Sequence, residues 1–189
     1  QPDTVIAIGG GSAMDAAKIA RYIYEYSLEQ EPGFLESYEK VSELFTRLQQ
    51  KFVDIRKRIV KFHHGTHTKL FCIPTTSGTG SEVTPYAVIT DDNTHVKYPL
   101  TDYEMTPQVA IVDPEFVMTV PKRTVAWSGL DTLSHALESY VSVMASDFTR
   151  PWSLQAIKLV FENLEKSYNY DPKNPTLEGE TARENMHYA

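Results

Sequence analysis

Asp131 and His135 are the residues whose types and spacing point most directly to chemistry, because they stand four positions apart in a segment that predicts a helix. Side chains four residues apart lie on one helix face, with Cβ atoms about 5–6 Å apart. Carboxylate oxygens and imidazole nitrogens both bind divalent cations, so the pair predicts half of a metal site. A second interpretation stays open, in which Asp131 follows an N-cap at Ser128 and favours the helix dipole, and His135 is an ordinary helix histidine.

Residues 5–24 predict a short apolar strand, a turn of three glycines and a helix. Because Gly10 and Gly11 have no Cβ atoms, a phosphate can approach the backbone there, and the N–H groups that open the helix point at the anion. The usual dinucleotide fingerprint is incomplete, since Met14 stands where a third glycine or alanine is expected. The alternative is a tight strand-to-helix turn, capped by Ser12, that binds nothing.

A loop rich in hydroxyl groups, residues 74–85, follows a second short apolar strand at residues 69–73. Its serines and threonines supply hydrogen-bond donors without charge, and ligands of open α/β sheets collect at the carboxyl ends of the strands. Ser, Thr and Gly are also ordinary loop residues, so this segment alone would not indicate a site. Its agreement with the glycine turn and the Asp131–His135 pair indicates a ligand site at the strand ends.

The elements that must position these residues alternate between strand and helix to about residue 116 and are mainly helical after Pro121. This order predicts an α/β fold: a doubly wound, parallel-sheet nucleotide-binding domain at residues 1–120, then the start of an all-helical metal-binding domain at residues 121–189. Residues 52–62 are also expected to be helical, and residues 171–175 to form a loop. The other expected elements are strands at residues 4–8, 69–73, 87–90 and 108–112, and helices at residues 13–26, 35–50, 124–143 and 152–165.

Composition narrows the class of protein. The net charge of −7 argues against a nucleic-acid partner, and the longest apolar runs have the length of strands, so we expect no membrane partner. Cys72 is the single cysteine, which rules out an internal disulfide and fits a reducing compartment, so we expect a cytoplasmic protein. His63, His64 and His67 lack helical spacing and a neighbouring carboxylate, and we expect no metal there.

Three segments of the chain, residues 9–18, 75–84 and 129–138, resemble the iron-containing alcohol dehydrogenase family and follow one another in the family's order. More narrowly, residues 54–59, 97–102 and 140–146 resemble the alcohol dehydrogenase half of the bifunctional aldehyde-alcohol dehydrogenases. The match is weakest at residues 27–50, a polar segment that is expected to be helical.

The resemblance implies NAD as the cofactor and a divalent metal, Fe2+ or alternatively Zn2+, held by one Asp and three His. By motif, Asp131 and His135 are two of these ligands, and the other two would lie downstream of Ala189. The strand that distinguishes NAD from NADP would precede Gln1, so we expect a fragment that is inactive alone. No catalytic residue is implied beyond the metal ligands. The residues implied to bind the cofactor are Gly10, Gly11, Ser12, Asp15, Thr75, Thr76, Thr79 and Lys97.

The implied reaction is hydride transfer between NAD and a small substrate, interconverting acetaldehyde and ethanol, as part of a bifunctional enzyme. The metal would polarise the substrate oxygen as a Lewis acid. One alternative is a relative with the same fold and another substrate, such as a polyol dehydrogenase or a dehydroquinate-synthase-like lyase. Another is a non-catalytic assembly module, because bifunctional members of the family stack into helical filaments and this chain alone cannot complete the metal site. The implied partners are further copies of the chain, in a homo-oligomer or a helical filament.

Overall fold

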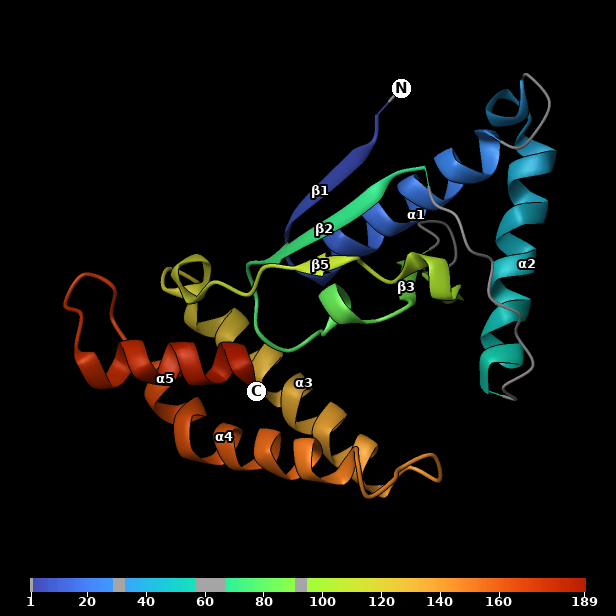
Figure 1. Ribbon diagram of the computed structural model, residues 1–189. Coiled ribbons are helices and arrows are strands. Elements are labelled where there is room, and N and C mark those ends of the chain that lie inside the picture. Colours follow the sequence, from blue (N-terminus) through green and yellow to red (C-terminus); the bar gives the residue numbers. More distant parts are fainter. Residues whose placement is uncertain (1, 29–32, 57–66, 91–94) are drawn as a thin grey trace. The chain divides into compact units, whose positions relative to one another are not determined.

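The computed structural model describes residues 2–28, 33–56, 67–90 and 95–189 (Figure 1). These residues form two compact units. The first comprises Gln1–Ile73 and Ser81–Ile111, and the second comprises Pro74–Gly80 and Val112–Ala189. The loop Pro74–Gly80 thus groups with the helices that follow it much later in the chain, an association that the order of elements did not indicate. The domain limits at residues 120 and 121 stay a prediction.

The first unit contains a three-stranded sheet in the order β1 (Thr4–Gly9), β2 (Lys69–Pro74) and β5 (Val109–Ala110). The central strand β2 runs parallel to β5, with Phe71 opposite Val109 and Cys72 opposite Ala110. The expected α/β class with parallel pairing is therefore confirmed. The strand expected at residues 108–112 is shorter than predicted, because only two of its residues pair.

Helix α1 (Gly11–Leu28) packs through two of its faces. Met14 is fully buried and packs with Ala7 of β1 and with Leu70 and Cys72 of β2. The third glycine of a dinucleotide fingerprint serves close packing of helix on strand, and here a methionine side chain fills that space. On its other face, α1 contributes Ile19 and Tyr22 to a second apolar cluster.

That second cluster covers an antiparallel hairpin formed by β3 (Tyr86–Thr90) and β4 (Lys97–Thr101). Strand β4 was not predicted, since its central Pro99 normally argues against a strand interior. Helix α2 (Tyr38–Arg56), which follows a short 3-10 turn at Phe34–Glu36, packs against this hairpin through Leu44 and Leu48. The helices expected at residues 35–50 and 52–62 are one helix as far as Arg56, and residues 57–62, like His63 and His64, lie outside the described residues.

The second unit contains α3 (Lys122–Val141), α4 (Arg150–Asn169) and α5 (Leu177–Tyr188), with α4 in contact with both others. The first two confirm the expected helices to within a few residues. Helix α5 was missed, because its sequence is polar and contains Gly179. Its signals are an N-cap at Thr176, whose hydroxyl accepts from the Gly179 N–H, and two glutamates in the first turn.

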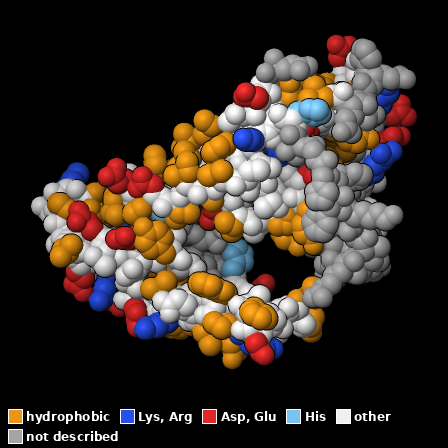
Figure 2. Space-filling model, in the orientation of Figure 1, with side chains coloured by type: hydrophobic (Ala, Val, Ile, Leu, Met, Phe, Trp, Pro, Cys, Tyr) orange, Lys and Arg blue, Asp and Glu red, His pale blue; other side chains and the backbone are white. Residues whose placement is uncertain are grey.

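Large apolar side chains are exposed on the helical unit. Trp127, Leu130, Trp152 and Phe161 are each more than half exposed. Figure 2 shows hydrophobic atoms interspersed with charged ones over this part of the surface. None of the helices in the described ranges is long and apolar enough to cross a bilayer.

Candidate metal centre and nucleotide-binding turn

Asp131 and His135 lie on one face of α3, with Asp131 Oδ1 3.8 Å from His135 Nε2. A cation at an ordinary ligand distance of about 2.0–2.2 Å would reach both atoms at once. The two side chains are 48% and 54% exposed, so the face is open to further ligands and to a substrate oxygen. Because α3 begins at Lys122, Asp131 is in the helix interior and Ser128 is not an N-cap. The interpretation of Asp131 as a first-turn charge is therefore wrong.

The His135 ring is held from its other side. Its Nδ1 lies 3.0 Å from the carbonyl oxygen of Gly78. A carbonyl can only accept, so Nδ1 carries a proton in this hydrogen bond, and in the neutral imidazole Nε2 is then the nitrogen with the lone pair. Metal-binding histidines usually have this arrangement, with the second ring nitrogen donating to a carbonyl or carboxylate. The donor set therefore fits iron or zinc, and sequence reasoning missed the contribution of Gly78.

Only glycine fits at position 78. Its φ is +145°, and a Cβ there would lie 2.2 Å from the carbonyl oxygen of Ser128 and 2.9 Å from Thr132 Oγ1. Thr132 Oγ1 itself donates to the Ser128 carbonyl across 3.0 Å. The backbone of the loop Pro74–Gly80 thus comes closer to α3 than any side chain would allow. This close approach is what brings the Gly78 carbonyl to His135.

Ser77, the neighbour of Gly78, contacts a second histidine. Its Oγ lies 3.0 Å from Nδ1 of His187 on α5. Burial lowers the pKa of His187, and the nearby Asp113 opposes that shift. His187 Nε2 is buried without a hydrogen-bond partner among the described residues. Sequence reasoning found no signal at His187, since it lies on the helix that was not predicted.

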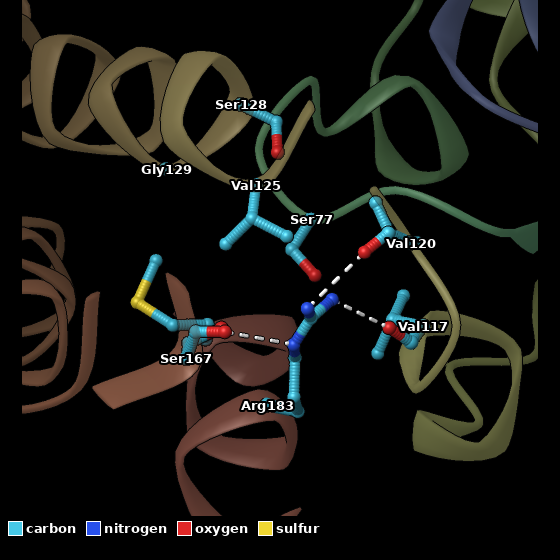
Figure 3. A pocket seen from close by; sticks show the side chains of 9 residues that line it. Ser77, Val117, Val120, Val125, Ser128, Gly129, Ser167 and Arg183 are labelled. Atoms are coloured by element: carbon cyan, nitrogen blue, oxygen red, sulfur yellow. Dashed lines mark hydrogen bonds between the residues drawn. The ribbon is translucent and has the colours of Figure 1, made fainter. Parts of the chain in front are cut away.

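A buried arginine lies one turn before His187 on α5. The Arg183 guanidinium donates to the carbonyl oxygens of Ser167 (3.0 Å), Val117 (2.9 Å) and Val120 (3.1 Å), as Figure 3 shows. These bonds tie α5 to the end of α4 and to the 3-10 turn Pro114–Val117. The small cavity beside Arg183, lined also by Ser77 and Gly129, has about 10 Å³ of space. That is about the room that one water needs, so this cavity is too small for a substrate.

The predicted metal site is incomplete within the described residues. Nowhere in this part of the chain do three or more His, Cys, Asp or Glu side chains group in a way that could hold a metal. Asp131 and His135 would hold a metal only together with further ligands, because structural and catalytic sites use at least three protein ligands.

The glycine turn has the geometry of a strand-to-helix anion site in the first unit. Gly9 has a φ of +154°, and a Cβ there would lie 2.6 Å from the Ala13 Cβ. The Gly10 carbonyl accepts from the Ala13 and Met14 N–H groups, each at 3.1 Å, which opens α1. The first turn of α1 has no acidic residue, so nothing there repels a phosphate. Ser12 is the second residue of α1 and not its cap.

Asp15 has protein partners in the structure. Its carboxylate accepts from Ser81 Oγ at 2.6 Å and from the Val88 N–H at 2.9 Å, which fastens α1 to β3 and the turn before it. The neighbouring Lys18 is fully buried and donates to the Tyr86 carbonyl at 2.8 Å. Burial lowers the pKa of Lys18, and Asp15 opposes this shift. A role of Asp15 in binding the cofactor stays a prediction.

The remaining predicted residues divide between the two units. Lys97 is exposed at the start of β4 in the first unit. Thr75, Thr76 and Thr79 are half-buried in the loop Pro74–Gly80, which belongs to the same unit as Asp131 and His135. The Thr76 hydroxyl is buried without a hydrogen-bond partner among the described residues, so it is a polar group that a bound ligand could satisfy.

Comparison with models of known protein families shows the family to which the chain belongs. The model for "Iron-containing alcohol dehydrogenase" matches residues 1–114, and that for "Fe-containing alcohol dehydrogenase family, C-terminal" matches residues 125–189. The chain belongs to the iron-containing alcohol dehydrogenase family. Within this family, it is 55% identical over its whole length to aldehyde-alcohol dehydrogenase 2 of Entamoeba histolytica and 50% identical to the bifunctional aldehyde-alcohol dehydrogenase of Escherichia coli K12. The expected resemblance to the bifunctional members is thereby confirmed.

The family fold is also present in solved structures. Sulfoacetaldehyde reductase from Bifidobacterium kashiwanohense, solved in complex with NAD+, superposes with a TM-score of 0.71 at 31% identity over 98% of this chain. This chain covers 42% of that structure and 19% of the length of each of the two aldehyde-alcohol dehydrogenases. The family relationship therefore concerns a part of the longer relatives.

Proposed function

We propose that this chain supplies the nucleotide-binding turn and two metal ligands of an NAD-linked, iron-dependent alcohol dehydrogenase, with zinc as the alternative metal. The observation that carries the proposal is the Asp131–His135 pair, whose facing atoms lie 3.8 Å apart while Gly78 holds the far side of the imidazole. Both aldehyde-alcohol dehydrogenases named above support the activity by their names, and the NAD+ complex of the reductase supports the cofactor.

A bound divalent metal would act as a Lewis acid on the substrate oxygen and lower the pKa of the alcohol. Asp131 and His135 would hold it through Oδ1 and Nε2, and their exposure would leave room for the substrate oxygen and for the remaining ligands. In the oxidation of ethanol, the carbon that bears the hydroxyl group gives a hydride to the nicotinamide and the hydroxyl proton goes to solvent, leaving acetaldehyde and NADH. The reverse reaction returns both.

The glycine turn would receive the pyrophosphate of NAD. Gly10 and Gly11 leave the backbone accessible at the start of α1, an 18-residue helix whose dipole favours an anion at that end. We propose further contacts from Ser12, Asp15, Thr75, Thr76, Thr79 and Lys97. The Thr76 hydroxyl, which lacks a partner among the described residues, supports its place in this group.

The direct test uses the full-length protein that contains this chain. Metal is removed with a chelator, Fe2+ or Zn2+ is restored, and NADH formation from ethanol is followed by absorbance. We expect activity to disappear with the metal and to return with at least one of the two ions. Ethanol turnover that is unchanged by complete metal removal would contradict the proposal. Turnover of a polyol, or of a substrate without net reduction of NAD, would favour the relatives with another substrate.

The acetaldehyde–ethanol pair and the bifunctional organisation are proposals drawn from the similarity to the aldehyde-alcohol dehydrogenases. A cytoplasmic location and assembly into a homo-oligomer or a helical filament stay predictions. Sedimentation of the full-length protein tests the assembly, and a filament that lacks all alcohol dehydrogenase activity would favour the structural role.

A further inference from the structure

We infer that Ser77 and Gly78 are positioning residues for His135: the Gly78 carbonyl selects the ring tautomer and orientation that present Nε2 to a metal, and Ser77 holds that carbonyl in place through His187. The inference rests on the proposed metal site. It assigns a role to the loop Pro74–Gly80 other than contact with the nucleotide.

A hydrogen bond 3.0 Å long joins His135 Nδ1 to the Gly78 carbonyl. His135 is 54% exposed, so few neighbours restrict its ring. Without a fixed acceptor, a neutral imidazole would exchange between its two tautomers and rotate on its helix. The carbonyl keeps the proton on Nδ1 and turns Nε2 toward Asp131.

The Gly78 carbonyl is itself placed by close packing of the loop against α3. The space around Gly78 is so restricted that a Cβ would lie 2.2 Å from the Ser128 oxygen, and Ser128 lies about two helical turns before His135 on α3. The loop therefore rests directly on the backbone of the helix that carries both ligands. A small shift of this loop would move the acceptor away from His135.

The loop is anchored to α5 through Ser77. Ser77 Oγ is hydrogen-bonded to His187 Nδ1 at 3.0 Å, and His187 lies four residues after Arg183 on the same side of α5. Arg183 is 3% exposed and makes three hydrogen bonds to backbone carbonyls, so α5 is rigidly held where His187 meets the loop. Figure 3 shows Ser77 beside the Arg183 side chain. Two consecutive loop residues thus connect two histidines on two helices.

The experiment measures metal affinity in the full-length protein, by competition for Zn2+ with a chromophoric chelator, and the visible spectrum of the Co2+-substituted protein. Loss of an outer-shell partner of a metal-binding histidine typically weakens metal binding 10- to 100-fold. We expect a loss of up to this size, and an altered Co2+ spectrum, for Ser77→Ala, His187→Ala and Gly78→Ala. Gly78→Ala is the most direct variant, but its Cβ could prevent folding, so the other two decide the question.

Matched variants separate positioning from general damage. His187→Asn places an amide near the position of Nδ1, so it should restore much of the affinity that His187→Ala loses. Ser134→Ala removes an exposed hydroxyl of α3 that donates to the Leu130 carbonyl of its own helix, and it should leave metal affinity unchanged. Thermal unfolding monitored by circular dichroism identifies any variant that has lost its fold.

Failure of the positioning role can be distinguished from failure of the proposed metal site. If the wild-type protein binds Zn2+ and Asp131→Ala does not, while Ser77→Ala and His187→Ala keep wild-type affinity and Co2+ spectrum, the positioning role is overturned and the proposed function stands. If the wild-type protein binds neither ion, or Asp131→Ala binds both as wild type does, the proposed metal site fails and the positioning role fails with it.

Discussion

Asp131 Oδ1 and His135 Nε2 face each other across 3.8 Å on successive turns of α3, while the opposite edge of the imidazole is hydrogen-bonded to the Gly78 carbonyl. One side of the ring is thus bound to the loop Pro74–Gly80, and the other side faces Asp131.

Asp131→Ala or His135→Ala in the full-length enzyme should remove the bound metal and nearly all oxidation of ethanol, because each change deletes one ligand of the site. NAD affinity should survive, since the glycine turn lies in the other compact unit. Elemental analysis measures the metal, and the change in protein fluorescence measures NAD binding. Metal content and turnover near those of wild type would show that these two residues are not ligands.

Gly10→Val should weaken NAD binding, because the branched side chain crowds the backbone that we propose to approach the pyrophosphate. His67→Ala is the control, since the His67 side chain is exposed and it is the backbone N–H of this residue that bonds to Glu25. A fluorescence titration with NAD compares the two variants with wild type. Unchanged affinity in the valine variant would remove the role of this turn as a phosphate site.

Arg183→Met should destabilise the helical unit by about 3 kcal/mol, because three buried carbonyl oxygens lose their donors while the apolar volume is partly kept. Arg150→Met is the matched control. Arg150 is 46% exposed and pairs with Asp147 at the surface, so its loss should cost less than about 1 kcal/mol. Urea unfolding followed by circular dichroism measures both, and equal effects would contradict the structural role of Arg183.

Glu25 should make the first unit more stable at neutral than at acidic pH. Partial burial raises the pKa of Glu25, but hydrogen bonds from Thr68 and from the His67 N–H outweigh that effect and lower it below the ordinary value. A carboxylate whose pKa is lower in the folded state stabilises the fold above its unfolded pKa. That contribution is lost as the pH falls through the lowered folded value.

Glu25→Gln should therefore cost about 1–2 kcal/mol at pH 7 and much less at a pH below the lowered pKa. Glu43→Gln, at an exposed position in α2, should have almost no effect at either pH. Urea unfolding at both pH values gives the comparison. A cost of Glu25→Gln that is the same at both pH values would mean that the charge of this carboxylate does not stabilise the fold.

Local sequence was sufficient for the features that depend on neighbours along the chain. Spacing of four placed Asp131 and His135 on one helix face, and the glycine run predicted the turn between β1 and α1. The helices expected from local sequence at residues 13–26, 124–143 and 152–165 likewise agree with α1, α3 and α4 to within a few residues. These features follow from the 3.6-residue helical period and from glycine's lack of a Cβ, both of which act over a few residues.

The other features depend on residues far apart in the chain. β4 contains a proline and exists because it pairs with β3, and α5 is polar along much of its length and is held by contacts with α4. Met14 replaces an expected glycine because Leu70 and Cys72 leave room for it. The Gly78 carbonyl meets His135 across 57 positions of sequence, and Ser77 meets His187 across 110. Sequence spacing alone could supply the two proposed ligands, but only the packing of the loop against α3 and α5 decides which nitrogen of His135 faces Asp131 and the proposed metal.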